Sequence, residues 1–184
     1  MKYAEELTRT MTWLGEKPDT LFLGQAVEYK GTAMTNTLKD VPIEKKLEMP
    51  VAEDLQMGMS IGLALGGTVP ISIYPRWNFL LLATNHIVNH IDKLHLMGAE
   101  PYKTKIIIRT SIGAEKPLFP LHQHTGDFTD VFELMCRNII VVRLDTPEQI
   151  FNSYRRAYER EDGKSTIIVE WGDAYNDPNW KVIK

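Results

Sequence analysis

Apolar positions along this chain follow two patterns, one typical of strands and one typical of helices, and the two alternate. Short apolar runs of strand length occupy residues 20–24, 69–74, 105–109, 139–142 and 166–170. Stretches with helical character occupy residues 3–15, 49–67, 77–97, 131–136 and 147–160. Strands that alternate with helices are typical of crossover units. We therefore expect an α/β fold of three layers, a mostly parallel sheet with helices on both faces.

Two segments lack both patterns and are expected to form loops. Residues 25–46 are polar and rich in threonine, and residues 110–128 contain glycine, proline and histidine without any period. A loop as long as the second one is usually functional in a compact domain. Ligands of parallel sheets bind at the carboxyl ends of the strands, so we expect the functional residues to meet at that edge.

The helix predicted within residues 49–67 carries three glycines on nearly one face, at Gly58, Gly62 and Gly66. Each glycine costs roughly 1 kcal/mol of helix stability relative to alanine. Such a cost is usually offset where another backbone approaches closely. A second face of this helix consists of larger apolar residues, namely Leu55, Met59 and Leu63. We expect that second face to pack in the core.

Composition narrows the class of protein. The chain has 184 residues, 43% hydrophobic and 24% charged, which is typical of an ordinary soluble protein with one domain over residues 1–184. Its net charge of −3 gives no support for binding to nucleic acid or to an anionic membrane. The single cysteine, Cys136, excludes an internal disulfide. With no apolar run that resembles a signal peptide or a membrane span, these features predict a cytoplasmic protein.

Three segments carry a resemblance to a known family. Residues 50–62 contain P-V-A-E followed by G-M-S-I-G, and residues 70–79 read P-I-S-I-Y-P-R-W-N-F. His124 is followed by Phe128 and Phe132. In this order and spacing, the segments resemble the pyrimidine-binding domain of thiamine-diphosphate enzymes. That domain occurs in the beta subunit of the first component of 2-oxo acid dehydrogenases and in the middle of transketolase.

The resemblance assigns the central role to Glu53. In the family, a glutamate at this place shares a proton with the aminopyrimidine ring of thiamine diphosphate and so activates the cofactor. The family also stacks an aromatic residue on the pyrimidine, which here would be Tyr74, Trp77 or Phe79. Phe79 matches the family best, and Trp77 matches only some members. On helix physics alone, Glu53 could instead be an ordinary first-turn acid, and the aromatic residues could belong to the core.

The resemblance also points to residues that would contact the substrate. His124 falls on the family's catalytic-loop histidine, which implies binding of the substrate or movement of protons. His122 in the same loop and Arg76 are further candidates. Arg76 could bind a substrate carboxylate through two hydrogen bonds, or it could be a solvated loop arginine. A second family histidine falls on Leu134, so the substrate and any transfer to a lipoyl group stay open.

Three other motifs resemble metal or phosphate sites, but each lacks a residue that such a site requires. His86 and His90 are four residues apart and could bind a metal ion, but no further ligand lies at a suitable spacing in the sequence. A polar face of the predicted helix is the simpler interpretation. Residues 163–165 (G-K-S) lack the upstream glycine of a phosphate-binding loop. Residues 172–174 (G-D-A) resemble the G-D-G motif that the family uses with magnesium and diphosphate, but that motif needs an asparagine some way further along the same fold, and the sequence ends at Lys184. We expect no diphosphate-binding domain and no C-terminal transketolase-like domain in this chain.

The family places its cofactor between a pyrimidine-binding and a diphosphate-binding domain. The resemblance therefore implies a beta-like subunit whose alpha-like partner holds the diphosphate and Mg²⁺, in an α2β2 assembly. The face formed by the three glycines would then pack at the subunit interface. The implied activity is cleavage of a carbon–carbon bond in a 2-oxo acid or ketose, with a dehydrogenase, decarboxylase or transferase outcome.

Two alternatives to this activity differ in class. One is a catalytically degenerate homologue that serves as a scaffold or regulatory subunit, although Glu53, whose loss would favour it, is present. The other is a flavodoxin-like or nucleotide-binding domain, but no glycine-rich phosphate loop follows a predicted strand.

Overall fold

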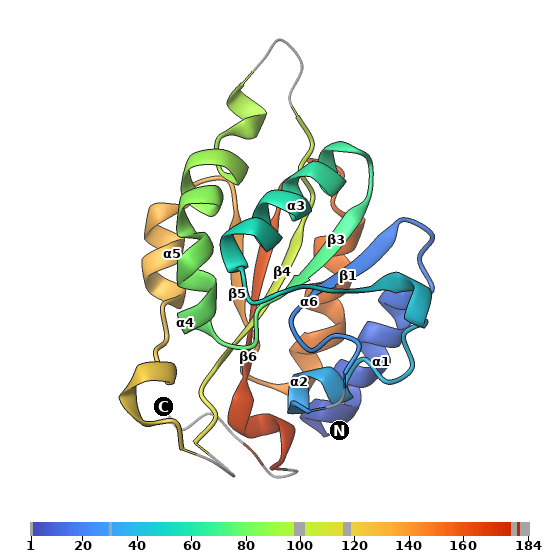
Figure 1. The fold of residues 1–184 in the computed structure, drawn as a ribbon, viewed down its shortest axis with the longest axis vertical. Helices are drawn as coiled ribbons and strands as arrows, with labels where there is room; N and C mark the ends of the chain where they lie inside the picture. The colour runs from blue at the N-terminus through green and yellow to red at the C-terminus, as the bar shows by residue number, and fades with distance from the viewer. Residues whose placement is uncertain (1, 30, 98–101, 116–118, 178–179, 181–184) are drawn as a thin grey trace.

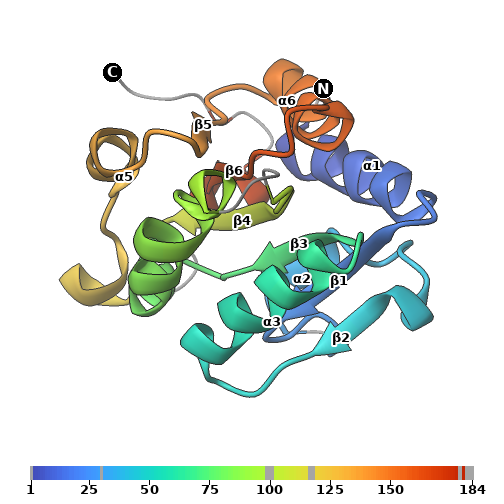
Figure 2. The same cartoon turned by 90° about the horizontal axis from the view of Figure 1, so that it is seen from above.

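The structure is a computed structural model that describes residues 2–29, 31–97, 102–115, 119–177 and 180. Its strands form one parallel sheet (Figure 1), in the order β2-β1-β3-β4-β6-β5 (Figure 2). The bounds of these strands are β1 Thr20–Gly24, β2 Lys46–Glu48, β3 Val69–Ile73, β4 Ile107–Ile112, β5 Ile140–Arg143 and β6 Thr166–Trp171.

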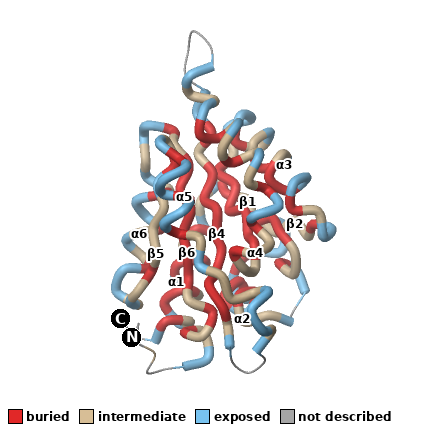
Figure 3. The backbone as a smooth tube through the Cα atoms, turned by 90° about the vertical axis from the view of Figure 1, so that its left-hand side faces the viewer, coloured by how far each residue is buried: buried red, intermediate tan, exposed pale blue. Residues whose placement is uncertain are grey.

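Helices cover both faces of this sheet (Figure 2). One face carries α1 (Tyr3–Gly15) and α6 (Pro147–Glu159). The other carries α3 (Glu53–Leu65), α5 (Thr129–Met135) and the segment that begins with α4 (Trp77–Leu80). The central strands are buried along their length, as expected for a parallel sheet covered on both faces (Figure 3). The predicted three-layer α/β fold is confirmed.

The helices α1 and α6 follow directly from their sequences. Leu7, Met11 and Leu14 repeat at helical spacing on α1 and are fully buried against the sheet. The helix α6 begins with a capping box at Thr146 and with Pro147 in its first turn. Both helices lie where the periodicity predicts them.

The prediction of a loop over residues 25–46 is wrong in part. This segment contains the short helix α2 (Ala33–Asn36) and a 3₁₀ turn (Ile43–Lys45), and it leads into the edge strand β2. The strand reads K-L-E and, among the described strands, pairs with β1 alone, in the register Phe22↔Lys46. An edge strand of three residues is held by backbone pairing and buries little apolar surface. Its sequence therefore contains no apolar run from which a strand could be predicted.

The single helix predicted over residues 77–97 is also wrong. After α4, the chain forms a 3₁₀ turn (Leu81–Ala83), a π-helix (His86–Ile91) and another 3₁₀ turn (Leu94–Leu96). The buried residues nevertheless keep a helical period, at Trp77, Leu80, Ala83, Ile87 and Ile91. The burial pattern therefore predicts the path of the segment, whereas its hydrogen bonds shift locally between i−3, i−4 and i−5 acceptors.

The loop predicted over residues 110–128 begins later than expected. The strand β4 continues to Ile112, because Thr110 and Ser111 are polar yet buried and paired with β6. Ser111 Oγ donates to the backbone oxygen of Pro75 at 2.6 Å, which satisfies its hydroxyl inside the protein. A 3₁₀ turn (Leu121–His124) lies further along the same segment.

The core-facing side of α3 differs from the prediction. Leu55 and Met59 are exposed, at 53% and 36%, and Leu63 is only partly buried. The residues that face the sheet are instead Glu53, Gln56, Met57, Ser60 and Ala64.

The close approach of another backbone to the glycines of α3, which the sequence predicts, is not found within the described residues. A Cβ at Gly62 would meet no described atom within 4 Å, and one at Gly58 would only touch the ring of His86.

Candidate functional site

Glu53, the first residue of α3, lies next to the carboxyl end of β1. It is nearly buried, with 4% of its surface exposed. The side-chain Nε2 of Gln25 donates a hydrogen bond to Glu53 Oε1 at 3.1 Å. From the part of the chain that the structure describes, no donor reaches the second oxygen, Oε2. This buried carboxylate therefore keeps one open acceptor.

A buried polar network holds the start of α3 against β3. The Nε2 of Gln56 donates to Ser72 Oγ at 3.1 Å and to the backbone oxygen of Ile73 at 2.9 Å. The hydroxyl of Tyr74 donates to the backbone oxygen of Glu53 at 3.3 Å. Burial raises the pKa of Tyr74, so this hydroxyl stays protonated and remains a donor. The network explains why polar residues form the inner side of α3.

The three candidate aromatic residues have different surroundings. Tyr74 and Trp77 are fully buried, and the Trp77 ring packs against Phe132 with a centroid distance of 4.9 Å. Phe79 is partly exposed and stacks on His124, with ring centroids 5.1 Å apart and an angle of 25° between the planes. Phe79 is therefore the one of these three rings that keeps accessible surface.

Arg76 brings the aromatic loop and the histidine loop together. Its Nη1 donates to the backbone oxygen of His124 at 3.3 Å. Burial lowers the pKa of Arg76, while the nearby charge of Asp173 opposes that change. The Nδ1 atom of His124 is buried and has no hydrogen-bond partner among the described residues. Arg76, Phe79 and His124 thus form one group, whereas His122 is exposed and contacts Phe119 edge-on.

A cavity of about 360 Å³ opens at the carboxyl ends of the strands next to this group. Its polar lining includes Arg76, Ser111, Tyr175 and Asn36. Apart from Arg76, these residues were not predicted from the sequence, and only the rule that ligands bind at strand ends could have pointed to Ser111. The cavity gives a substrate-sized space beside Arg76, whereas Glu53, Phe79 and His124 are not among its lining residues.

The G-D-A segment at residues 172–174 has a structural role. A Cβ at Gly172 would lie 2.9 Å from the backbone of Gly113 and Ala114, so only glycine fits this close approach. Asp173 Oδ1 accepts a hydrogen bond from the backbone N–H of Glu115 at 2.9 Å. The segment joins the end of β6 to the end of β4.

A buried ion pair on β4 and β6 was missed by the sequence analysis. Arg109 donates to both oxygens of Glu170, from Nε at 2.7 Å and from Nη2 at 2.9 Å, and both side chains are fully buried. The hydroxyls of Tyr154 and Tyr175 also donate to Glu170. Burial, together with the charge of Glu170, raises the pKa of both tyrosines and keeps them protonated.

His86 and His90 form a polar pair rather than a ligand set. Their Nδ1 atoms lie 3.2 Å apart, and His86 Nε2 lies 3.3 Å from Asp54 Oδ1. Over the described ranges, no three or more His, Cys, Asp or Glu side chains come together as metal ligands. The same ranges contain no helix long and apolar enough to cross a membrane.

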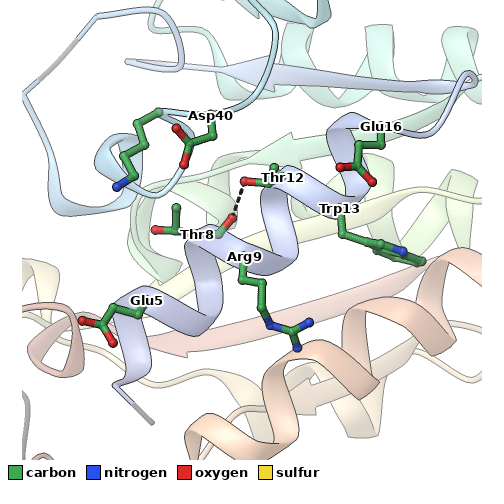
Figure 4. Close-up of a pocket in the computed structure, with 8 residues that line it drawn as sticks. Glu5, Thr8, Arg9, Thr12, Trp13, Glu16 and Asp40 are labelled. Carbon is green, nitrogen blue, oxygen red and sulfur yellow. Dashed lines mark hydrogen bonds between the residues drawn. The ribbon is translucent and has the colours of Figure 1, made fainter.

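A larger groove, of about 550 Å³, lies on the outer side of α1 (Figure 4). Charged side chains line it, including Glu5, Arg9, Glu16 and Asp40. The helix α1 covers the face of the sheet opposite to α3, so this groove is separate from the group around Glu53.

The chain matches a known family over almost its whole length. A family model described as "Transketolase, pyrimidine binding domain" matches residues 2–176. The beta subunit of mitochondrial pyruvate dehydrogenase E1 from Ascaris suum is 33% identical over 95 residues, which are 52% of this chain and 26% of that protein. The corresponding subunit of Saccharomyces cerevisiae is 30% identical over 133 residues, 70% of this chain and 36% of that protein. The chain spans well under half the length of these relatives.

A solved structure described as "Split gene transketolase, inactive beta4 tetramer" shares the fold. The TM-score is 0.65 at 19% sequence identity, and the match covers 94% of this chain and 52% of that one. At that identity the likeness concerns the fold alone. The family match rests on the sequence itself and agrees with the parallel sheet described above. The chain belongs to the family of transketolase pyrimidine-binding domains.

Proposed function

We propose that this chain is the beta-like subunit of a thiamine-diphosphate-dependent enzyme that acts on a 2-oxo acid or a ketose. The reaction would cleave a carbon–carbon bond next to the carbonyl, or transfer the resulting acyl or two-carbon group. The observation that carries this proposal is the buried Glu53. One of its oxygens is held by Gln25, and the other accepts no hydrogen bond from a described residue.

Glu53 and Phe79 each carry a feature that fits an aminopyrimidine ring. Oε2 of Glu53 accepts no hydrogen bond from a described residue and is free to share a proton with a ring nitrogen. Phe79 offers a partly exposed flat ring on which a pyrimidine could stack. When bound, thiamine diphosphate supplies the carbon nucleophile that attacks the substrate carbonyl. The role of Glu53 is to hold the proton that sets the cofactor's reactive form.

Arg76 and His124 would serve the substrate. Arg76 lines the cavity at the strand ends, and its guanidinium could bind the carboxylate of a 2-oxo acid. His124 carries a buried Nδ1 without a described partner, so this nitrogen is available for a hydrogen bond to a ligand. His122, exposed beside Phe119, would act only if its loop moved.

An alpha-like partner would complete the enzyme by holding the diphosphate and Mg²⁺. The outward side of α3 supports such a partner, because it exposes Leu55, Met59, Gly62 and Leu65. An exposed apolar helix face of this kind is typical of a subunit interface. The relatives described as beta subunits fit the same interpretation. We expect an α2β2 assembly in which Gly58, Gly62 and Gly66 lie at the interface.

The alternative is a catalytically degenerate homologue that acts as a scaffold or regulatory subunit. The observation that favours it is Leu134, which replaces the second histidine of the family pattern and is 86% exposed. A hydrophobic side chain so exposed suits contact with another protein better than contact with a polar substrate.

Calorimetric titration separates these two functions. Thiamine diphosphate with Mg²⁺ would be titrated into the chain co-expressed with a candidate alpha-like subunit, using wild type, Glu53→Gln and the exposed control Glu133→Gln. All three complexes should bind the cofactor, and only Glu53→Gln should fail to exchange the thiazolium proton, as followed by NMR. Absence of cofactor binding in the wild-type complex would overturn the enzyme proposal in favour of the scaffold.

A further inference from the structure

Gln25 directly follows β1, in a turn that the rest of the protein holds tightly. The strand ends at Gly24, where any Cβ would clash with the backbone oxygen of Ile73. The next residue after Gln25, Ala26, has a φ of 55°, in the left-handed region that residues other than glycine rarely adopt. Such a conformation persists only where the surroundings enforce it.

The carboxylate of Glu48 enforces this turn. It accepts hydrogen bonds from three successive backbone N–H groups, those of Ala26 at 2.6 Å, Val27 at 2.8 Å and Glu28 at 3.0 Å. Successive N–H groups around a left-handed residue form a nest that binds anions, and here the protein fills the nest with its own side chain. Glu48 is the last residue of β2 and pairs with Gly24, so the sheet itself positions this anion.

The turn aims the side-chain amide of Gln25 at Glu53. The Nε2–Oε1 hydrogen bond of 3.1 Å occupies one carboxylate oxygen and leaves the other open. An amide donates without ever losing its proton, so it orients the carboxylate but cannot compete for the proton that Glu53 would share. The neutral amide of Gln25 thus orients the carboxylate of Glu53 without a charged side chain.

We propose that Gln25 is a positioning residue for Glu53, and that Glu48 holds Gln25 in place. By occupying Oε1, the amide of Gln25 leaves Oε2 as the oxygen that meets the aminopyrimidine. This inference rests on the proposed function for the identity of the ligand. The orientation of Glu53 by Gln25 is a property of the chain itself.

Two variants of Gln25 test the role. Gln25→Met keeps the length of the side chain but removes the donor, and Gln25→Glu replaces the donor with a second acceptor and a negative charge. Gln25 is only partly buried, so both variants should fold. The matched control is Gln123→Met, because Gln123 is exposed in the turn Leu121–His124.

The first readout needs no cofactor. Glutamate residues would be labelled with ¹³C at the side-chain carboxyl, and the Glu53 signal would be identified by its absence in Glu53→Gln. In Gln25→Met this signal should move from its wild-type chemical shift at a fixed neutral pH, because the carboxylate has lost the hydrogen-bond donor on Oε1. The change should be larger in Gln25→Glu and absent in Gln123→Met. Identical chemical shifts of Glu53 in the wild type and Gln25→Met would overturn the proposal.

The second readout uses the complex with the alpha-like subunit. A positioning role predicts that Gln25→Met binds thiamine diphosphate within about threefold of wild type, while exchange of the thiazolium proton slows on the order of tenfold. Equal losses of affinity and exchange would instead make Gln25 a general binding residue and contradict the proposal. If no complex binds the cofactor but the carboxyl signal still shifts, the proposed function is wrong and the positioning of Glu53 stands.

Discussion

Two buried carboxylates in this protein have opposite surroundings. Glu170 on β6 accepts hydrogen bonds from Arg109 at both oxygens and from the hydroxyls of Tyr154 and Tyr175. Among the described residues, the carboxylate of Glu53 at the start of α3 accepts one hydrogen bond, from Gln25, although Glu53 is almost equally buried. One anion is fully surrounded by donors, and the other keeps an open oxygen.

The difference indicates which carboxylate stabilises the fold and which can act on a ligand. Oε2 of Glu53 is not among the fully enclosed side-chain atoms that lack a partner, so this oxygen keeps accessible surface although the residue as a whole is buried. A carboxylate bound to an arginine and two tyrosines has no capacity left for another partner. An open carboxylate oxygen at the carboxyl edge of a parallel sheet, in contrast, is available to a ligand.

The largest expected effect comes from breaking the satisfied pair. In Glu170→Gln, the charge of Arg109 stays buried without its counter-charge, so we expect the free energy of unfolding to fall by about 3–5 kcal/mol. Urea unfolding followed by tryptophan fluorescence measures this loss. The double variant Arg109→Met/Glu170→Met should lose less than Glu170→Gln alone, because it leaves no unpaired charge. A loss below about 1 kcal/mol in Glu170→Gln would remove the contrast with Glu53.

A smaller effect should follow from removing one neutral donor of Glu170. Tyr154→Phe keeps the ring in the core and deletes the hydroxyl that donates to Glu170. A hydrogen bond to a charged group contributes about 1.5–3 kcal/mol, so the free energy of unfolding should fall by that amount. Thermal unfolding of Tyr154→Phe beside Tyr158→Phe, whose partner Asp19 is less buried, provides the comparison. Equal losses in the two variants would mean that burial of the acceptor is unimportant.

Glu53→Gln should change the stability little. The new side-chain oxygen can still accept the hydrogen bond from Gln25, and no charge is left without a partner, so a change within about 1 kcal/mol is expected. The same urea experiment measures it. Because thiazolium proton exchange should be lost at the same time, this variant separates activity from folding. A loss as large as that of Glu170→Gln would make Glu53 a structural carboxylate.

Much of the fold could be predicted from apolar pattern because central parallel strands are buried on both faces. The exceptions share a cause. The edge strand β2 (K-L-E) needs pairing rather than burial, and the inner side of α3 uses Gln56 and Ser60, which are polar but satisfied by β3. The apolar pattern of α3 therefore predicted Leu55 and Met59 as core residues, although both are exposed on the surface.

The candidate site was only partly predictable for a different reason. Glu53, Phe79 and His124 lie in segments with family motifs, so the sequence marks them. The partner of Glu53 lies 28 residues away in the chain, and the partner of Arg109 lies 61 residues away. No spacing rule joins such positions, because the parallel topology brings them together only after the sheet forms.

A third carboxylate, Asp162, sharpens the comparison because it also pairs with an arginine but is far more exposed than Glu170. Asp162 accepts hydrogen bonds from Nε and Nη2 of Arg160 at 2.8 and 2.6 Å, much as Glu170 does from Arg109, but about half of its side chain is exposed. The hydrogen bond from Arg160 lowers the pKa of Asp162 from 3.8 to about 2. Because the pKa of Asp162 is lowered in the folded protein, its pairing with Arg160 stabilises the fold at pH values above 3.8. This contribution disappears as the pH falls from 3.8 toward 2.

Solvent screens the pair, so the free energy of unfolding of Asp162→Asn should be lower than that of the wild type by less than about 1 kcal/mol at pH 7. Urea unfolding of wild type and Asp162→Asn at pH 7 and at low pH should show this small difference shrinking on acidification. A loss at pH 7 comparable to that of Glu170→Gln would mean that the arginine contacts alone, rather than their burial, determine the stability of such pairs.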